Sequence, residues 1–151
     1  MKTEKLKILI DTNVAITYIS GREDKYADEC VAIVNYCANG KCDGYIAQHS
    51  ISTIWYYTRR LPQKIRREWL LNICTALTVV GASHDSIIEA IKKDDFSDFE
   101  DCLQDKCAKE ADCDYIATAN TTDFKFSEVL AITPAECLRL IDSEEAGGDW
   151  V

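Results

Sequence analysis

The chain has 151 residues, and its 17 Lys and Arg against 26 Asp and Glu give a formal net charge of −9. This length fits one compact domain, and a composition of 47% hydrophobic and 28% charged residues excludes a globally disordered chain. The longest stretches without a charged residue, Gly44–Thr58 and Leu70–His84, are too short and too polar to cross a bilayer. Met1–Lys7 lacks the apolar core of a signal peptide. We therefore expect a cytoplasmic protein with no membrane contact.

Short apolar segments alternate with helical patterns along the chain. In order, Leu6–Ile10 is a predicted strand that ends abruptly at Asp11, and Val14–Ser20 is a short helix closed by Gly21. Next come helix Asp24–Ala38, strand Gly44–Ala47, helices Ser50–Arg60 and Pro62–Ala76, strand Leu77–Val80, and helix Asp85–Lys93 capped by Ser83. The last are a helix over 97–111, strands Tyr115–Thr118 and Val129–Thr133, and helix Pro134–Ile141.

This alternation predicts the fold class. Apolar strands separated by helices indicate a parallel sheet that is covered by helices on both faces. We expect an α/β protein, a three-layer α/β/α sandwich with a parallel, Rossmann-like sheet of about five strands. One domain should span residues 1–142, and residues 143–151, which show no periodicity, should form a mobile tail.

Eight cysteines stand at positions 30, 37, 42, 74, 102, 107, 113 and 137. None belongs to a Cys-x-x-Cys pair and only two histidines accompany them, which argues against a zinc site. Disulfide frameworks belong to small secreted domains that cannot build a core. We predict free thiols, most of them buried as small hydrophobic side chains.

Acidic residues follow the predicted strand ends. Asp11 ends the first strand, Asp98 and Asp101 lie in the first turn of a later helix, and Asn120 and Asp123 follow the fourth strand. Right-handed crossovers place all these positions at one edge of the sheet, where ligands of open α/β folds bind. Each acid also has a simpler explanation, as a turn residue or as a complement to a helix N-terminus. Their joint occurrence favours a site.

Carboxylates that lie close together need a nearby positive charge to offset their repulsion. Three of them about 5 Å apart repel by roughly 3 kcal/mol per pair at an effective dielectric constant near 20. Oxygen ligands without nearby His or Cys suit Mg²⁺ or Mn²⁺, which activates water toward a phosphodiester. Ser97-Asp98-Phe99-Glu100 also has the form of a capping box. That pattern assigns Glu100 to the helix end, and we leave Glu100 out of the predicted site.

Four blocks resemble the PIN-domain ribonucleases, the fold of VapC-type toxins. They are Ile8–Val14 with Asp11-Thr12-Asn13, Asp98–Gln104, Asp114–Phe124 and Ile132–Leu138, which together cover about residues 6–141. The resemblance implies a PIN-like fold and an acidic pocket that binds Mg²⁺ or Mn²⁺ and cuts RNA. It also suggests an antitoxin partner and a homodimer.

The resemblance also implies which residues form the pocket. Asp11, Asp101 and Asp123 match the family's acids, as metal ligands and catalytic residues. The supporting positions are Thr12, Asn13, Thr53, Asp98, Thr118 and Asn120. Thr53 is a departure, because PIN domains usually carry a Glu about there. A hydroxyl orients water but brings no charge, so this departure puts catalysis in doubt rather than the fold.

Five cations fall within nine residues: Arg59, Arg60, Lys64, Arg66 and Arg67. They predict contact with RNA phosphates, and Trp55, Tyr56 or Tyr57 would stack on a base; the alternative is a solvated helical face.

Three functions remain open at this point. The first is a metal-dependent endoribonuclease, as the toxin of a toxin–antitoxin pair. The second is a PIN-fold module that binds RNA or protein, with catalysis weakened or lost at Thr53. The third is a receiver-like or phosphatase-like domain with Asp11 as nucleophile. Asn13 disfavours its phosphatase form, which would require a second Asp at that position.

Overall fold

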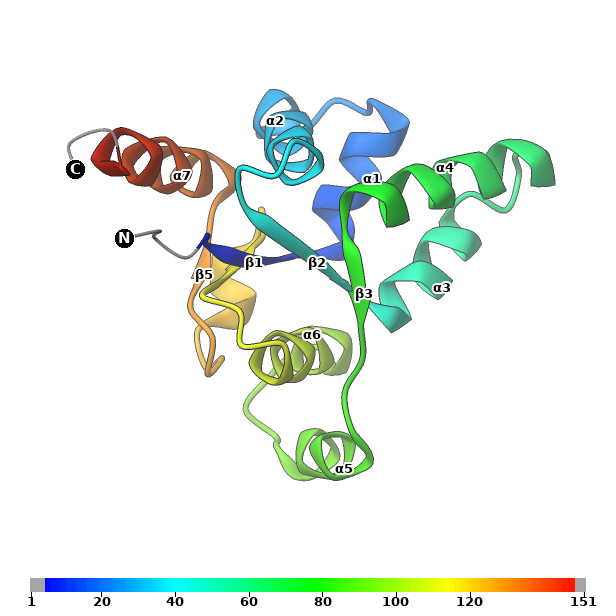
Figure 1. The fold of residues 1–151 in the computed structure, drawn as a ribbon. Coiled ribbons are helices and arrows are strands. Elements are labelled where there is room, and N and C mark those ends of the chain that lie inside the picture. Colours follow the sequence, from blue (N-terminus) through cyan, green and yellow to red (C-terminus); the bar gives the residue numbers. More distant parts are fainter. Residues whose placement is uncertain (1–4, 149–151) are drawn as a thin grey trace.

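The computed structural model describes residues 5–148 and contains one five-stranded parallel sheet (Figure 1). Its strands are β1 (Lys7–Ile10), β2 (Asp43–Ala47), β3 (Thr78–Val80), β4 (Tyr115–Ala117) and β5 (Ala131–Ile132). Their order across the sheet is β3-β2-β1-β4-β5, with every pairing parallel. The predicted parallel sheet of five strands is confirmed.

The helices cover both faces of the sheet, as predicted. They are α1 (Thr12–Ser20), α2 (Ala27–Ala38), α3 (Gln48–Tyr57), α4 (Gln63–Ala76), α5 (His84–Lys92), α6 (Phe99–Glu110) and α7 (Pro134–Gly148), with a short 3₁₀ helix η1 (Thr121–Phe124). Helices α1, α2, α4 and α7 lie on one side of the sheet, and α6, with α5 outside it, lies on the other (Figure 1).

Side chains of the central strand alternate between two hydrophobic cores. Ile8 and Ile10 pack into the core under α1, α2, α4 and α7, whereas Leu9 packs into the core under α6. All three are fully buried. A strand buried on both faces explains why its sequence is apolar throughout rather than alternating. The eight cysteines are free, and all but the exposed Cys74 are buried, as predicted.

Local signals set several helix ends. Gly21 closes α1 at a φ of 63°, a left-handed conformation that favours glycine. Ser83 caps α5 and accepts a hydrogen bond from the Ser86 amide at 3.2 Å. The last helix, expected to end at Ile141, runs on to Gly148, so the predicted tail begins as helix. Residues 149–151 lie outside the described residues. Between residues 5 and 148, no helix is long and apolar enough to span a membrane.

The predicted capping box at Ser97 is wrong. Helix α6 begins at Phe99 and its cap is Asp98, whose Oδ1 accepts a hydrogen bond from the Glu100 amide at 2.8 Å. A short Asp side chain two residues before the amide reaches it directly, which makes Ser97 unnecessary. The Glu100 side chain is therefore not needed to cap this helix.

Candidate functional site

Five carboxylate side chains line one cavity of about 240 Å³ at the carboxyl edge of the sheet. They are Asp11 after β1, Asp98, Glu100 and Asp101 at the start of α6, and Asp123 in η1. Thr12, Asn13, Thr53 and Asn120 line the same cavity, together with Ile16, Tyr57, Gln104 and Phe124. The structure thus brings together the three predicted catalytic acids and all but one of the supporting residues.

The parallel register explains why these distant positions meet. Ile10 at the end of β1 lies beside Ala117 at the end of β4, and the Asp11 amide donates to the Ala117 carbonyl at 3.1 Å. The chain then turns into α1 after the first strand and into η1 after the fourth. Both turns therefore start at the same edge of the sheet.

Asp11 is the most enclosed of the acids, with 5% of its surface exposed. Its Oδ1 accepts from the Thr12 amide at 2.9 Å and its Oδ2 from the Thr118 hydroxyl at 2.8 Å. Thr118 itself is fully buried, so it fixes Asp11 from behind the cavity. These two bonds fix the orientation of the Asp11 carboxylate and leave lone pairs on both oxygens.

Burial and like charge raise the pKa values of two of these acids. Burial raises the pKa of Asp11 to about 6, against the opposing hydrogen bonds from Thr118 and Thr12. The pKa of Asp101 rises to about 7, first through burial and then through the negative charge of Asp11. Asp98, Asp123 and Glu100 add further repulsion at Asp101. Burial and neighbouring negative charge thus both favour the protonated forms of these two acids.

A buried network of polar side chains supports the cavity. The Gln104 amide nitrogen donates to the Thr12 and Ser50 hydroxyls, each at 2.8 Å, and these two hydroxyls are 2.6 Å apart. Gln104 is 1% exposed, and its Oε1 has no hydrogen-bond partner among the described residues. The sequence offered one signal for Gln104, because it lies three residues after Asp101 and so faces the same side of the helix.

The rim of the cavity carries a cation that sequence reasoning missed. Arg22 Nη2 donates to the Asn13 carbonyl at 3.3 Å, and Arg22 Nε donates to the Thr17 hydroxyl at 3.0 Å. The guanidinium also lies over the Tyr57 ring, 5.9 Å from its centroid. Arg22 therefore holds positive charge beside the two rim residues Asn13 and Tyr57. No sequence motif marks it, because it lies in the segment between α1 and α2.

Thr53 and Glu100 form a direct contact across two helices. The Thr53 hydroxyl donates to Glu100 Oε1 at 2.7 Å, joining α3 to α6 at the wall of the cavity. The expectation that Glu100 belongs only to the helix end is wrong, because Asp98 occupies the capping position. The carboxyl group is thereby left to face Thr53.

The donor chemistry of this cavity suits a hard divalent cation. All five acidic side chains offer oxygen atoms, which Mg²⁺ and Mn²⁺ prefer as ligands. Among the side chains described, no three from Asp, Glu, His and Cys stand close enough to form a ready-made ligand group. Mg²⁺ does not require one, since it keeps several waters and uses one or two carboxylates directly. The donor chemistry of the cavity is therefore compatible with such an ion.

The predicted basic cluster is divided by the structure. Arg66 is 9% exposed; its guanidinium donates to the Trp55 carbonyl at 2.6 Å and lies 3.5 Å from the Trp55 ring centroid. The prediction that Arg66 contacts RNA is therefore wrong, because its buried side chain joins α4 to α3. Arg59 packs on the Tyr56 ring and Arg67 lies near Trp55, whereas Arg60 and Lys64 are exposed.

We expect Arg66→Ala to lower the free energy of unfolding by about 2 kcal/mol, because it removes a charged hydrogen bond and a cation–π contact. Urea unfolding followed by circular dichroism measures this change. The matched control is Arg60→Ala, an exposed cation of the same cluster, for which we expect a change below about 0.5 kcal/mol. Equal effects of the two substitutions would contradict the structural role of Arg66.

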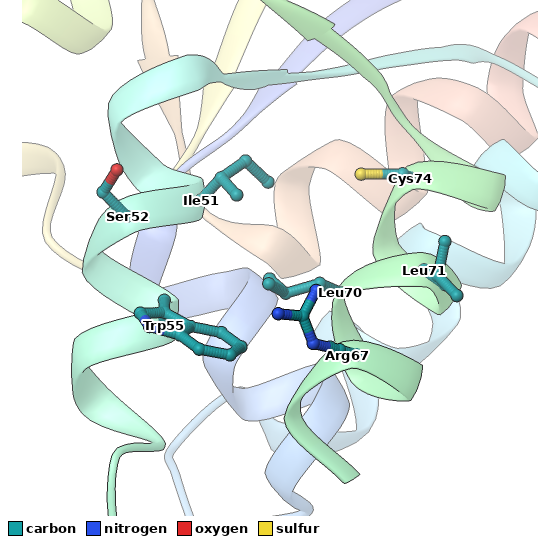
Figure 2. Close-up of a pocket in the computed structure, with 7 residues that line it drawn as sticks. All are labelled: Ile51, Ser52, Trp55, Arg67, Leu70, Leu71 and Cys74. Carbon is teal, nitrogen blue, oxygen red and sulfur yellow. The ribbon is translucent and has the colours of Figure 1, made fainter. Parts of the chain in front are cut away.

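A second, apolar groove lies between α3 and α4, apart from the acidic cavity (Figure 2). Its volume is about 550 Å³ and its lining residues are Ile51, Ser52, Trp55, Arg67, Leu70, Leu71 and Cys74. Leu71 at its edge is 66% exposed. Apart from Arg67 and Cys74 its lining lacks titratable groups, which disfavours a catalytic role for this groove.

Comparisons with known proteins agree with this architecture. The chain matches a family model described as a PIN domain over residues 7–122. The crystal structure of VapBC2 from Rickettsia felis, bound to a DNA fragment from their promoter, aligns with a TM-score of 0.60 at 16% identity, covering 85% of this chain and 98% of that chain. No curated protein matches this sequence.

A second similar structure is that of Mycobacterium tuberculosis VapC20, a toxin that cleaves the sarcin–ricin loop. It aligns with a TM-score of 0.55 at 13% identity, over 72% of this chain and 86% of that chain. Both structures share the fold, and the family model covers well over half of the sequence. The chain belongs to the PIN-domain family.

Proposed function

We propose that this protein is a Mg²⁺- or Mn²⁺-dependent endoribonuclease that hydrolyses RNA phosphodiesters. The observation that carries the proposal is the meeting of Asp11, Asp101 and Asp123, distant in sequence, around one oxygen-lined cavity. Burial, and after it the negative charge of neighbouring acids, raises the pKa values of Asp11 and Asp101, and a divalent cation would favour their ionised forms.

In this function the three acids would hold the ion, which supplies positive charge to the scissile phosphate and activates the attacking water. The protein's own residues provide the positioning. Thr118 and the Thr12 amide fix both oxygens of Asp11, so that this carboxylate keeps one orientation. Asn120 and Asn13 add neutral polar groups at the cavity wall, suited to water or to sugar hydroxyls.

Because a net charge of −9 repels RNA, binding of RNA requires a local region of positive charge beside the cavity. Arg22 supplies one cation at the cavity rim, and Tyr57 beside it offers a ring on which a base can stack. Exposed Arg60, between α3 and α4, and exposed Lys64, in the first turn of α4, remain candidates for phosphate contact.

A nuclease assay tests the proposal. Single-stranded and structured RNA would be incubated with the purified protein in Mn²⁺, Mg²⁺ or EDTA, and the products separated by gel electrophoresis. We expect internal cleavage with either ion and none in EDTA. Cleavage that persists in EDTA, or that survives Asp11→Asn unchanged, would contradict it.

The second candidate function is RNA or protein binding without cleavage. Thr53 favours it, because this residue stands about where PIN domains usually carry an acid. It predicts RNA binding in a gel-shift assay with no cleavage, even at saturating Mn²⁺. The same RNAs and protein preparation distinguish the two functions.

We further propose that the protein is the toxin of a toxin–antitoxin pair. The Rickettsia felis structure contains such a pair, VapBC2. In this chain the apolar groove between α3 and α4 supports the proposal, since a partner helix with an apolar face would cover Ile51, Leu70 and Leu71 (Figure 2). Co-expression with the product of an adjacent gene should yield a stable complex, and Leu71→Glu should weaken it.

A further inference from the structure

Two carboxylates of the cavity lie outside the three matched acids: Asp98, which caps α6, and Glu100. Glu100 stands in the first turn of α6, and its Oε1 accepts the Thr53 hydroxyl at 2.7 Å. The two residues lie 47 positions apart in sequence and on different helices. By the resemblance to PIN domains, Thr53 stands about where that family usually carries a Glu, and the structure places it on α3.

We propose that Glu100 supplies from α6 the carboxylate that α3 lacks, and that Thr53 acts as its positioning residue. This inference rests on the proposed nuclease function and deepens it. It assigns Glu100 to the cation-binding end of the cavity, as a fourth acid beside Asp11, Asp101 and Asp123. It also explains how the site tolerates a threonine at position 53.

The local geometry leaves Glu100 available for this role. Asp98 caps α6 through the Glu100 amide, so the Glu100 side chain is not needed at the helix end. A threonine within a helix ordinarily bonds the carbonyl four residues earlier. For Thr53 that acceptor, the His49 carbonyl, is 3.2 Å away, whereas the Glu100 oxygen is at 2.7 Å. The shorter, charge-assisted bond holds the carboxylate against α3.

Electrostatics place Glu100 within the same cluster. Its negative charge raises the pKa of Asp11 by more than that of Asp123 does. It also adds to the rise in the pKa of Asp101. At Asp101 its contribution is the smallest of the four acids, so these shifts add only that Glu100 lies near both carboxylates, while the cavity lining and the bond to Thr53 carry the proposal.

A second feature of the cavity points to a ligand independently of the acids. Gln104, which lines it, is 1% exposed and leaves its Oε1 without a partner among the described residues. A buried amide oxygen costs free energy unless something bonds it, so a ligated water or a hydrated cation beside the acids would satisfy it.

The competing explanation is that the Thr53–Glu100 bond only ties α3 to α6. The chain offers a matched control for this possibility. At the start of α7, the Thr133 hydroxyl donates to Glu136 Oε1 at 3.0 Å, in the first turn of a helix and outside the acidic cavity. Glu136→Gln and Thr133→Val thus remove the same type of contact without touching the site.

The experiment measures Mn²⁺ binding to the full-length protein by isothermal titration calorimetry and by the EPR signal of free Mn²⁺, alongside RNA cleavage. We expect Glu100→Gln to weaken Mn²⁺ binding by about tenfold or more, as loss of a supporting carboxylate does in metal sites. Thr53→Val should weaken it by roughly two- to tenfold, because it frees the carboxylate but keeps its charge. Glu136→Gln and Thr133→Val should bind Mn²⁺ as the wild type does.

A double variant tests whether a carboxylate supplied from α3 can replace the one that Glu100 supplies from α6. Thr53→Glu combined with Glu100→Gln returns a carboxylate to α3, and it should regain most of the Mn²⁺ affinity that Glu100→Gln loses. Equal Mn²⁺ affinity of wild type and Glu100→Gln, or a double variant as weak as Glu100→Gln, would overturn the inference and leave the nuclease function standing. A wild type that binds no Mn²⁺ and cuts no RNA would overturn both.

Discussion

Asp101→Asn is expected to reduce metal-dependent RNA cleavage on the order of a hundredfold or more. Loss of a residue that merely supports a metal ligand costs about 10- to 100-fold, so loss of a direct ligand should reach at least the upper end of that range. Asp101 lines the cavity with the four other acids, and burial, followed by the negative charge of all four, raises its pKa. Initial cleavage rates at saturating Mn²⁺ measure the effect.

The stability of Asp101→Asn distinguishes a metal site from the simplest alternative, a purely structural role of Asp101 at the end of the helix. If Asp101 only complements the N-terminus of α6, asparagine should destabilise the fold by about 0.3–1 kcal/mol. If Asp101 belongs to a repulsive cluster, asparagine should stabilise the metal-free protein at pH 8. Asp85→Asn is the matched control, because Asp85 lies in the first turn of α5 and away from the cavity. A loss of stability at both positions, with cleavage unchanged, would contradict the metal site.

Strand and helix patterns were enough to predict the sheet and the meeting of the acids. Leu6–Ile10 ends at Asp11 in sequence, and parallel topology alone brings that position beside the end of β4. Gly21 and Ser83 mark helix ends through backbone conformation and a short side-chain bond, which are local effects. Such features depend on neighbours in sequence and are predictable for that reason.

Roles that depend on the exact backbone conformation or on contacts between helices were not predictable. Ser97 and Asp98 both suit the cap of α6, and only the backbone conformation decides between them. The role of Glu100 follows from that choice and from Thr53 on another helix. Arg66 resembles its neighbouring cations in sequence, yet packing against Trp55 removes it from the surface. One-dimensional patterns carry no information on which of several similar side chains is buried.

Without a divalent ion, the protein should lose stability as the pH rises from about 4 to about 7. In the unfolded chain Asp11 and Asp101 ionise near 3.8, whereas in the folded chain burial and mutual repulsion raise their pKa values to about 6 and about 7. Between these values the folded state binds more protons, so the free energy of unfolding falls with rising pH. For buried Asp11 the loss is about 3 kcal/mol. Partly exposed Asp101 adds a smaller loss because water screens it.

Urea unfolding at pH 5, 6, 7 and 8 measures this slope for the wild type and for Asp11→Asn. Burial lowers the pKa of His49, which acts in the opposite direction, and comparison of the two proteins cancels that contribution. The variant should show the shallower fall and the higher stability at pH 8. Millimolar Mn²⁺ should restore the wild type at pH 8 and have little effect on the variant, since only a folded site binds the ion. If the free energy of unfolding changed with pH equally in the wild type and in Asp11→Asn, the pKa of Asp11 would not be raised in the folded protein. The ionised Asp11 would then cost no free energy for a bound cation to recover.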